Sequence, residues 1–180
     1  INNSGKIIVK PKQDKIMPPD ENNMRLITKG RKKFIVDSTG NRIIGPYKNL
    51  YNAGDGFYAR KKGKKQILYD IHGEKTGKFI SQRNLIVSDS VVLTKYALKY
   101  QYYTLNGDSL LKPFRIASTF QNNMAIVGTN SQTLIIDKEG KVKKVLPFSG
   151  RIKKAEFDEN MLAHIRFRSL YFLVDTNGRT

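Results

Sequence analysis

Short runs of apolar and β-branched residues, interrupted at regular intervals by polar turns that contain glycine, recur along the whole chain. Successive turn glycines are 35, 33, 34, 33 and 38 residues apart; they are Gly5, Gly40, Gly73, Gly107, Gly140 and Gly178. Most turns begin with Asp or Asn, whose side chain bonds the backbone two residues on, and glycine supplies the positive φ that a short hairpin needs. The spacing therefore predicts repeated hairpins, with positive φ at Gly40, Gly73 and Gly140.

Each repeat is predicted to hold a first strand, a second strand that ends at the glycine turn, and a third strand after it. The first strands are expected at Met24–Thr28, Phe57–Arg60, Val91–Lys95, Met124–Gly128 and Met161–Arg166. The second strands are expected at Phe34–Asp37, Ile67–Asp70, Tyr102–Leu105, Leu134–Asp137 and Tyr171–Asp175. The third strands are expected at Lys6–Lys10, Arg42–Tyr47, Lys78–Ile80, Leu110–Phe114 and Val142–Phe148, and short fourth strands at segments such as Asn84–Ser88 and Arg115–Ser118. Helical periodicity is absent, and β-branched and aromatic residues dominate.

Repeats of about 33 residues that consist of short antiparallel strands are typical of propeller blades. The predicted fold is therefore all-β, a five-bladed β-propeller-like ring in one repeat domain over residues 1–180. Its repeats fall at approximately 24–56, 57–90, 91–123, 124–160 and 161–180, the last completed by 1–23. Pairing of Lys6–Lys10 with Leu170–Asp175 would close the ring and leave no open sheet edge. The alternative is a stretch of a longer array.

Residues Gly30–Tyr47 combine a turn rich in Gly and Lys, a short strand ending in Asp, a turn glycine, and an apolar pair before Pro and an aromatic residue. This pattern resembles the bacterial WG (KWG) repeat, and Gly63–Asp70 with Gly73 matches it next best. The family is named for a Trp-Gly pair, and this chain has no Trp; near that place stand Lys33, Gln66, Gln101, Thr133 and Ser169. The resemblance implies a divergent β-rich repeat used for binding, with no catalytic residues to carry over. An unrelated β-propeller with similar turns is the alternative.

The charge balance is unusual, because 33 Lys and Arg stand against 15 Asp and Glu and give a net charge of +18. Such an excess favours an anionic partner. In an antiparallel meander, the connections between first and second strands share one end of the sheets, and here they hold no acidic residue. The predicted site for an anion or nucleic acid consists of basic residues and tyrosines of these connections: Lys29, Arg31, Lys32, Lys33, Arg60, Lys61, Lys62, Lys64, Lys65, Lys95, Tyr96, Lys99, Tyr100, Arg166 and Arg168.

The sequence gives little indication of catalytic or metal-binding chemistry. The absence of Cys excludes disulfides, thiol catalysis and cysteine-ligated zinc. His72 is expected to be an exposed turn residue and His164 a packed or edge residue, and no nucleophile triad or phosphate loop stands out. Most Asp turns offer a single carboxylate, which indicates hairpin caps rather than calcium loops. We therefore expect no enzymatic activity, no cofactor and no metal, and we expect no membrane span because no apolar run approaches about 18 residues.

The sequence favours a non-enzymatic binding or scaffold module whose basic face docks on nucleic acid, an acidic protein or another anionic polymer. Nucleic acid comes first because its phosphate charge density matches a large cationic face. The 23 lysines against 10 arginines favour diffuse attraction over the reading of individual bases. The alternatives are a cell-surface or secreted propeller that binds carbohydrate or protein, and a structural subunit of a larger assembly.

Overall fold

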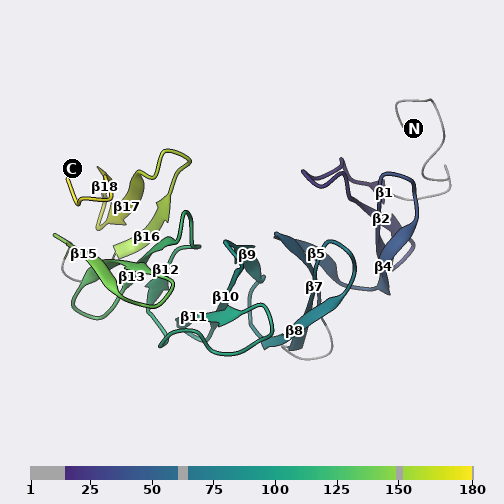
Figure 1. Ribbon diagram of the computed structural model, residues 1–180, viewed down its shortest axis with the longest axis horizontal. Helices are drawn as coiled ribbons and strands as arrows, with labels where there is room; N and C mark the ends of the chain where they lie inside the picture. The colour runs from purple at the N-terminus through teal and green to yellow at the C-terminus, as the bar shows by residue number, and fades with distance from the viewer. Residues whose placement is uncertain (1–14, 61–64, 149–151, 180) are drawn as a thin grey trace. The chain divides into compact units, whose positions relative to one another are not determined.

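A computed structural model describes residues 15–60, 65–148 and 152–179. The regular structure in these ranges is entirely β-strand (Figure 1), which confirms the predicted all-β class. The described part of the chain contains no helix that is long and apolar enough to cross a membrane. The fold divides into two compact units, residues 1–79 and 80–180.

The first unit contains two antiparallel meanders. Its first meander consists of β1 (Lys15–Ile16), β2 (Arg25–Lys29), β3 (Lys32–Val36) and β4 (Arg42–Tyr47). Its second meander consists of β5 (Leu50–Gly54), β6 (Gly56–Arg60), β7 (Lys65–Tyr69) and β8 (Lys75–Ile80), which ends at the boundary of the unit. The two meanders share one apolar core, which includes Ile35, Ile44, Leu50, Phe57 and Ile67.

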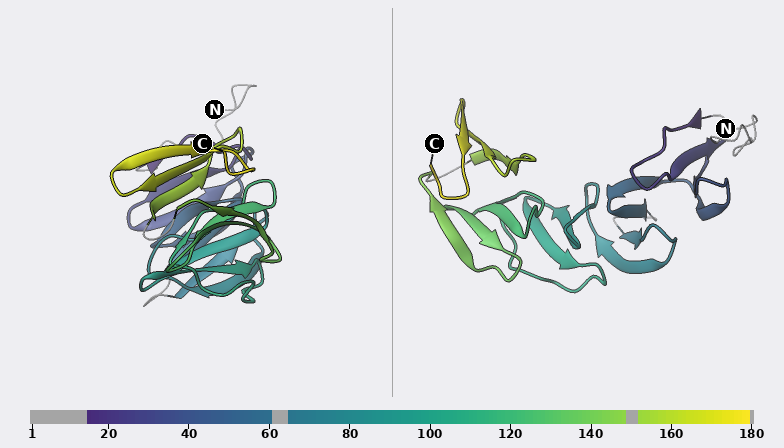
Figure 2. Two further views of the ribbon diagram at one scale, coloured as in Figure 1. Left: turned by 90° about the vertical axis from the view of Figure 1, so that its left-hand side faces the viewer. Right: turned by 45° about the horizontal axis from the view of Figure 1, so that its top comes forward.

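The second unit contains three further groups of strands (Figures 1 and 2). The first group is β9 (Ile86–Ser88), β10 (Val91–Tyr96) and β11 (Lys99–Thr104). The second group is β12 (Ile116–Ala117), β13 (Met124–Gly128), β14 (Thr133–Asp137) and β15 (Val142–Leu146). The third group is β16 (Ile152–Phe157), β17 (Ala163–Phe167) and β18 (Leu170–Val174).

Strands β13 and β14 of the middle sheet of the second unit are buried on both faces, which explains their nearly continuous apolar sequences, whereas β15 is exposed from Val142 to Val145. Side chains alternate between the two faces of a strand. Ala125 and Val127 of β13 accordingly pack with β10 and β11, whereas Ile126 packs with β16 and β17. Both faces of β13 are therefore core, and its sequence lacks the polar alternation of a half-exposed strand.

The predicted turns form as expected at Gly40, Gly73, Gly107, Gly140 and Gly178, whereas Gly5 lies outside the described residues. Gly40, Gly73 and Gly140 have φ of 90°, 87° and 81°, which confirms the prediction. The carboxylate at the start of the turn accepts backbone N–H bonds, as when Asp37 Oδ1 binds the N–H groups of Thr39 and Asn41, each at 2.9 Å. We call the end of each sheet that carries the turns at Asp20, Asp37, Asp70, Asp137, Asp158 and Asp175 the aspartate end.

Two of these aspartate turns were not predicted, because they lack glycine. They precede β2 and β17 and begin at Asp20 and Asp158. The left-handed position is taken by Asn23 in the first and by Met161 in the second, with φ of 57° and 59°. The predicted strand at Met161–Arg166 consequently begins only at Ala163, after the turn is complete.

The predicted third strand at Leu110–Phe114 does not form. Only isolated bridges join Tyr103 to Ser109 and Tyr100 to Phe114. The amide of Gln101 interrupts the ladder, because its Nε2 donates to Leu111 O and to Ser109 Oγ. Pro113 adds to the interruption, since it has no N–H to donate.

The short fourth strands are confirmed as β9 and β12. The predicted closing strand Lys6–Lys10 lies outside the described residues, so its pairing with Leu170–Asp175 stays a prediction. We call the end of each sheet opposite the aspartate end the basic end; it carries the connections β2–β3, β6–β7, β10–β11, β13–β14 and β17–β18.

Candidate functional site

A groove of about 570 Å³ lies at the basic end of the second unit. Four cationic side chains line it, namely Lys95, Lys99, Arg115 and Lys153. Its other polar side chains are those of Tyr100, Thr129 and Asn130, and Leu98, Pro113, Phe114 and Ile116 complete the lining. No carboxylate lines this groove, which we call the cationic groove.

The β10–β11 hairpin supplies four of the lining residues, Lys95, Leu98, Lys99 and Tyr100. Lys95 lies directly across from Tyr100 in the ladder, and Tyr96 lies across from Lys99. Lys95 Nζ donates to the Tyr100 hydroxyl at 3.1 Å and lies 4.4 Å from the centroid of its ring. This cation–π contact holds the ammonium group at the mouth of the groove instead of leaving it free in solvent.

Arg115 is held by backbone bonds on both sides. Phe114 exchanges two backbone bonds with Tyr100, at 2.7 and 2.9 Å, and so fixes the residue before Arg115 to β11. The Arg115 N–H donates to Gly128 O at 3.1 Å, at the end of β13. Lys153 comes from β16 and reaches the groove from the third sheet of the unit. The four cations thus come from three separate segments that converge on one concavity.

The electrostatics of the groove favour an anion. Within the described residues, no carboxylate forms an ion pair with any of the four groove cations; the lysine–carboxylate pairs in this unit join Lys138 to Asp89, Lys143 to Asp137 and Lys154 to Glu156. Like charges that line a concave, partly apolar surface focus the field into it and raise the local concentration of anions. The arrangement therefore suits the reversible capture of an anionic group.

A second basic cluster lies in the first unit, around Tyr51. Lys33 Nζ stands 4.9 Å and Arg60 Cζ 5.8 Å from the centroid of the Tyr51 ring, which stacks on Tyr58 at 5.1 Å. Burial raises the pKa of the Tyr58 phenol to about 12, although the nearby charge of Arg60 acts in the opposite direction. Both cations and Tyr51 itself are half-buried. We call these four residues the Tyr51 cluster.

The structure brings together only part of the predicted set. Lys95, Lys99 and Tyr100 meet in the cationic groove, and Lys33 and Arg60 meet in the Tyr51 cluster. Arg166 stands over Tyr171 and Arg168 over Phe167, outside the cationic groove. The remaining described members are exposed at their turns or strand ends: Lys29, Arg31, Lys32, Lys65 and Tyr96. Lys61, Lys62 and Lys64 lie outside the described residues.

Two groove cations, Arg115 and Lys153, were absent from the predicted set. The prediction counted only the connections between first and second strands. In a meander, however, the segments that lead from the third to the fourth strand return to the same end of the sheet. Arg115 directly precedes β12, and Lys153 is the second residue of β16. Including those segments in the count would have identified both residues.

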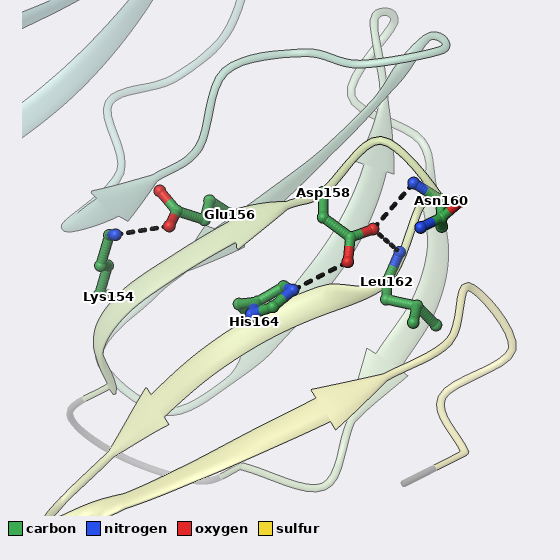
Figure 3. A network of polar contacts seen from close by, with 6 residues as sticks. All are labelled: Lys154, Glu156, Asp158, Asn160, Leu162 and His164. Carbon is green, nitrogen blue, oxygen red and sulfur yellow. Dashed lines mark hydrogen bonds and ion pairs between the residues drawn. The ribbon is translucent and has the colours of Figure 1, made fainter.

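The two histidines belong to the aspartate end. His72 is an exposed turn residue whose N–H binds Asp70 Oδ1, as expected. His164 Nε2 lies 2.9 Å from Asp158 Oδ2, while Asp158 Oδ1 accepts the N–H groups of Asn160 and Leu162 (Figure 3). The bond from His164 and those from the backbone hold the pKa of Asp158 below its ordinary value. Among the described residues, no three His, Asp or Glu side chains gather as a metal site would require.

The comparisons with known proteins bear on the fold. No protein-family model matches the chain, and no curated protein matches it. The chain is similar in structure to Hsv2 of Kluyveromyces lactis with its loop 6CD replaced by a Gly-Ser linker, at a TM-score of 0.61 and 7% identity over 93% of this chain and 64% of that one. It is also similar to Hsv2 of Kluyveromyces marxianus, with a TM-score of 0.59 and 9% identity over 94% and 60% of the two chains.

A third similar structure is described as a eukaryotic initiation factor, with a TM-score of 0.62 and 10% identity over 97% of this chain and 55% of that one. The chain thus spans less than two thirds of the length of these three proteins. Together with the repeated antiparallel sheets, the likeness establishes a β-propeller-like fold and says nothing of the ligand. The resemblance to the WG repeat stays a prediction.

Proposed function

We propose that this chain is a non-enzymatic binding module that holds an anionic polymer, nucleic acid first, in the cationic groove of its second unit. The observation that carries the proposal is the lining of that groove, where four cations converge and no carboxylate opposes them. Four positive charges around one groove suit a ligand with repeated negative charges better than a single small anion.

The polar lining also favours binding over catalysis. Besides its cations, the groove offers one phenol, one hydroxyl and one carboxamide, and neither histidine nor carboxylate lines it. These groups donate hydrogen bonds to phosphate oxygens but do not supply the paired acid and base of a hydrolytic site. Three of the four cations are lysines, which favours binding that is largely indifferent to base sequence.

The test is fluorescence anisotropy with a labelled mixed-sequence oligonucleotide at several salt concentrations. If all four cations meet phosphates of a single strand, log K should fall against log salt with a slope of about −3. The triple change Lys99→Glu, Arg115→Glu and Lys153→Glu should weaken binding by at least about a hundredfold and flatten the slope towards −1.

A matched control carries Glu at Lys141, Lys144 and Arg179, which are exposed in the same unit; it changes the net charge equally but lies outside the groove. It should retain binding to within about tenfold, since it alters only long-range attraction. Equal loss in both variants would contradict a localised groove. Failure of oligonucleotides, heparin and polyglutamate to bind at low salt would overturn the proposal and favour the carbohydrate-binding or assembly alternatives.

A further inference from the structure

A second groove adjoins the cationic groove across the β10–β11 turn. Its volume is about 680 Å³, and it is lined in part by Tyr96, Leu98, Gln101, Tyr103 and Pro113. Leu98, Lys99 and Pro113 line both grooves. Leu98 stands at the tip of the turn and is 82% exposed, so the turn forms a ridge with a cationic groove on one side and a largely apolar groove on the other.

The alternation of side chains in the hairpin produces this division. Tyr96 and Lys99 are cross-strand partners on one face, and Gln101 and Tyr103 follow Lys99 on that face at intervals of two residues. Lys95 and Tyr100 are the neighbouring pair and point to the opposite face. One face of the hairpin therefore presents Tyr96 and Tyr103 to the apolar groove, and the other presents Lys95 and Tyr100 to the cationic groove, while Lys99 at the turn lines both.

We propose that the ligand of this paired site is a single-stranded nucleic acid that crosses the ridge, with phosphates in the cationic groove and bases in the apolar groove. This inference rests on the proposed function and narrows its ligand. A single strand carries a charged phosphate and an accessible apolar base face in every nucleotide, and bases stack on aromatic side chains irrespective of sequence.

A duplex matches the pair of grooves less well. Its base faces are stacked on one another, so that it can offer phosphates to the cationic groove but no base to Tyr96, Tyr103 or Leu98. An acidic peptide could bring both charge and apolar side chains, but the two tyrosines of the groove favour a planar base. The juxtaposition of the grooves therefore favours the single strand over both of these ligands.

Three labelled ligands of equal length separate these possibilities: a mixed-sequence single strand, the corresponding duplex, and an abasic phosphodiester backbone. The single strand should bind about tenfold or more tightly than the abasic backbone, because one base–aromatic stack is worth about that factor. Both ligands should lose affinity in the Lys99→Glu, Arg115→Glu, Lys153→Glu variant.

The apolar groove is tested by the double change Tyr96→Ser and Tyr103→Ser, two residues that line this groove and not the cationic groove. This variant should bind the single strand about tenfold more weakly and should bind the abasic backbone and the duplex as the unaltered protein does. Leu170→Ser with Tyr171→Ser is the matched control: these residues are 63% and 72% exposed, belong to the β17–β18 hairpin and line neither groove. The control should bind all three ligands normally.

The outcomes distinguish the two proposals. If the abasic backbone and the duplex bind as tightly as the single strand, the single-strand inference is overturned and the proposed polyanion binding stands. If polyglutamate or heparin binds and no nucleic acid does, the inference is overturned as well. If none of these polyanions binds, the proposed function itself fails.

Discussion

The two ends of each sheet differ in the partners of their charged side chains. At the aspartate end, the turn carboxylates accept hydrogen bonds from the backbone. Asp175 Oδ1, for example, accepts the N–H groups of Asn177 and Arg179. At the basic end, the cations of the cationic groove have no carboxylate partner within the described residues. Charge that is satisfied within the fold stabilises a turn, whereas charge left unopposed around a concavity is available to a ligand. The net charge of a chain therefore does not by itself locate a binding site.

The largest contrast between the two ends is expected from glycine substitutions. Gly73 lies at the aspartate end with φ of 87°, and a Cβ there would stand 2.7 Å from Ile43 O. Gly30 lies at the basic end with φ of 58° and has nothing within 4 Å of the same position. Gly73→Ala should cost about 3 kcal/mol of unfolding free energy and Gly30→Ala about 1 kcal/mol, as measured by urea denaturation. Equal losses of unfolding free energy in the two variants would show that the close approach of the turn to Ile43 contributes nothing to the cost of Gly73→Ala.

A second contrast separates the two units. Lys33 and Arg60 stand over the Tyr51 ring, whereas the groove cations surround an open volume. Changing Arg31, Lys32 and Lys65, which are exposed in the first unit, to Glu should weaken oligonucleotide binding by only about tenfold, through long-range attraction. A loss comparable to that of the groove variant would place the main contact surface in the first unit, at the cluster of Lys and Arg residues that the sequence emphasises.

The smallest effect is expected at acid pH. The pKa of Asp158 lies below its ordinary value of 3.8 in the folded protein, because His164 and the backbone bind the carboxylate. The stability that this group contributes is complete above about pH 4 and is lost as the pH falls towards its folded pKa. Asp158→Asn should therefore lose less stability than the unaltered protein between about pH 5 and 3.

Thermal unfolding at several pH values would measure this difference. Glu159→Gln is the control, since it removes a charge from the same turn without removing the turn acceptor. If the Asp158→Asn variant lost as much stability between about pH 5 and 3 as the unaltered protein, the titration of Asp158 would contribute nothing to that loss.

The sequence predicts the fold well wherever the signal is local. The turn glycines and most of the predicted strands depend on neighbouring residues, and those within the described residues were found where the pattern placed them. The Asp158 turn was not predicted because Met161 occupies a position that glycine usually takes. The strand at Leu110–Phe114 failed for a related reason, since a side-chain amide from Gln101, nine or more residues away, replaces ladder bonds in a way that no pattern within the segment reveals.

The site was harder to predict than the fold. Lys95, Lys99 and Tyr100 were found because they lie in one hairpin, and their cross-strand register follows from the turn. Arg115 and Lys153 join them only through the packing of three sheets, which the spacing of repeats does not determine. The exposed β17–β18 arginines show the converse, because Arg166 and Arg168 share the predicted composition and still line no part of the cationic groove.

The burial of β13 and β14 on both faces has a consequence for how such a chain can change. Ala125, Ile126 and Val127 alternate between two cores, so the middle sheet of the second unit packs against both of its neighbours in that unit through apolar faces. Arrays of this kind behave approximately as chains of nearest-neighbour interfaces. The residues of the β10–β11 turn can therefore be replaced, extended or changed in charge while the apolar interfaces between the sheets stay intact. A library of variants in this one turn would give a family of binders on a constant framework.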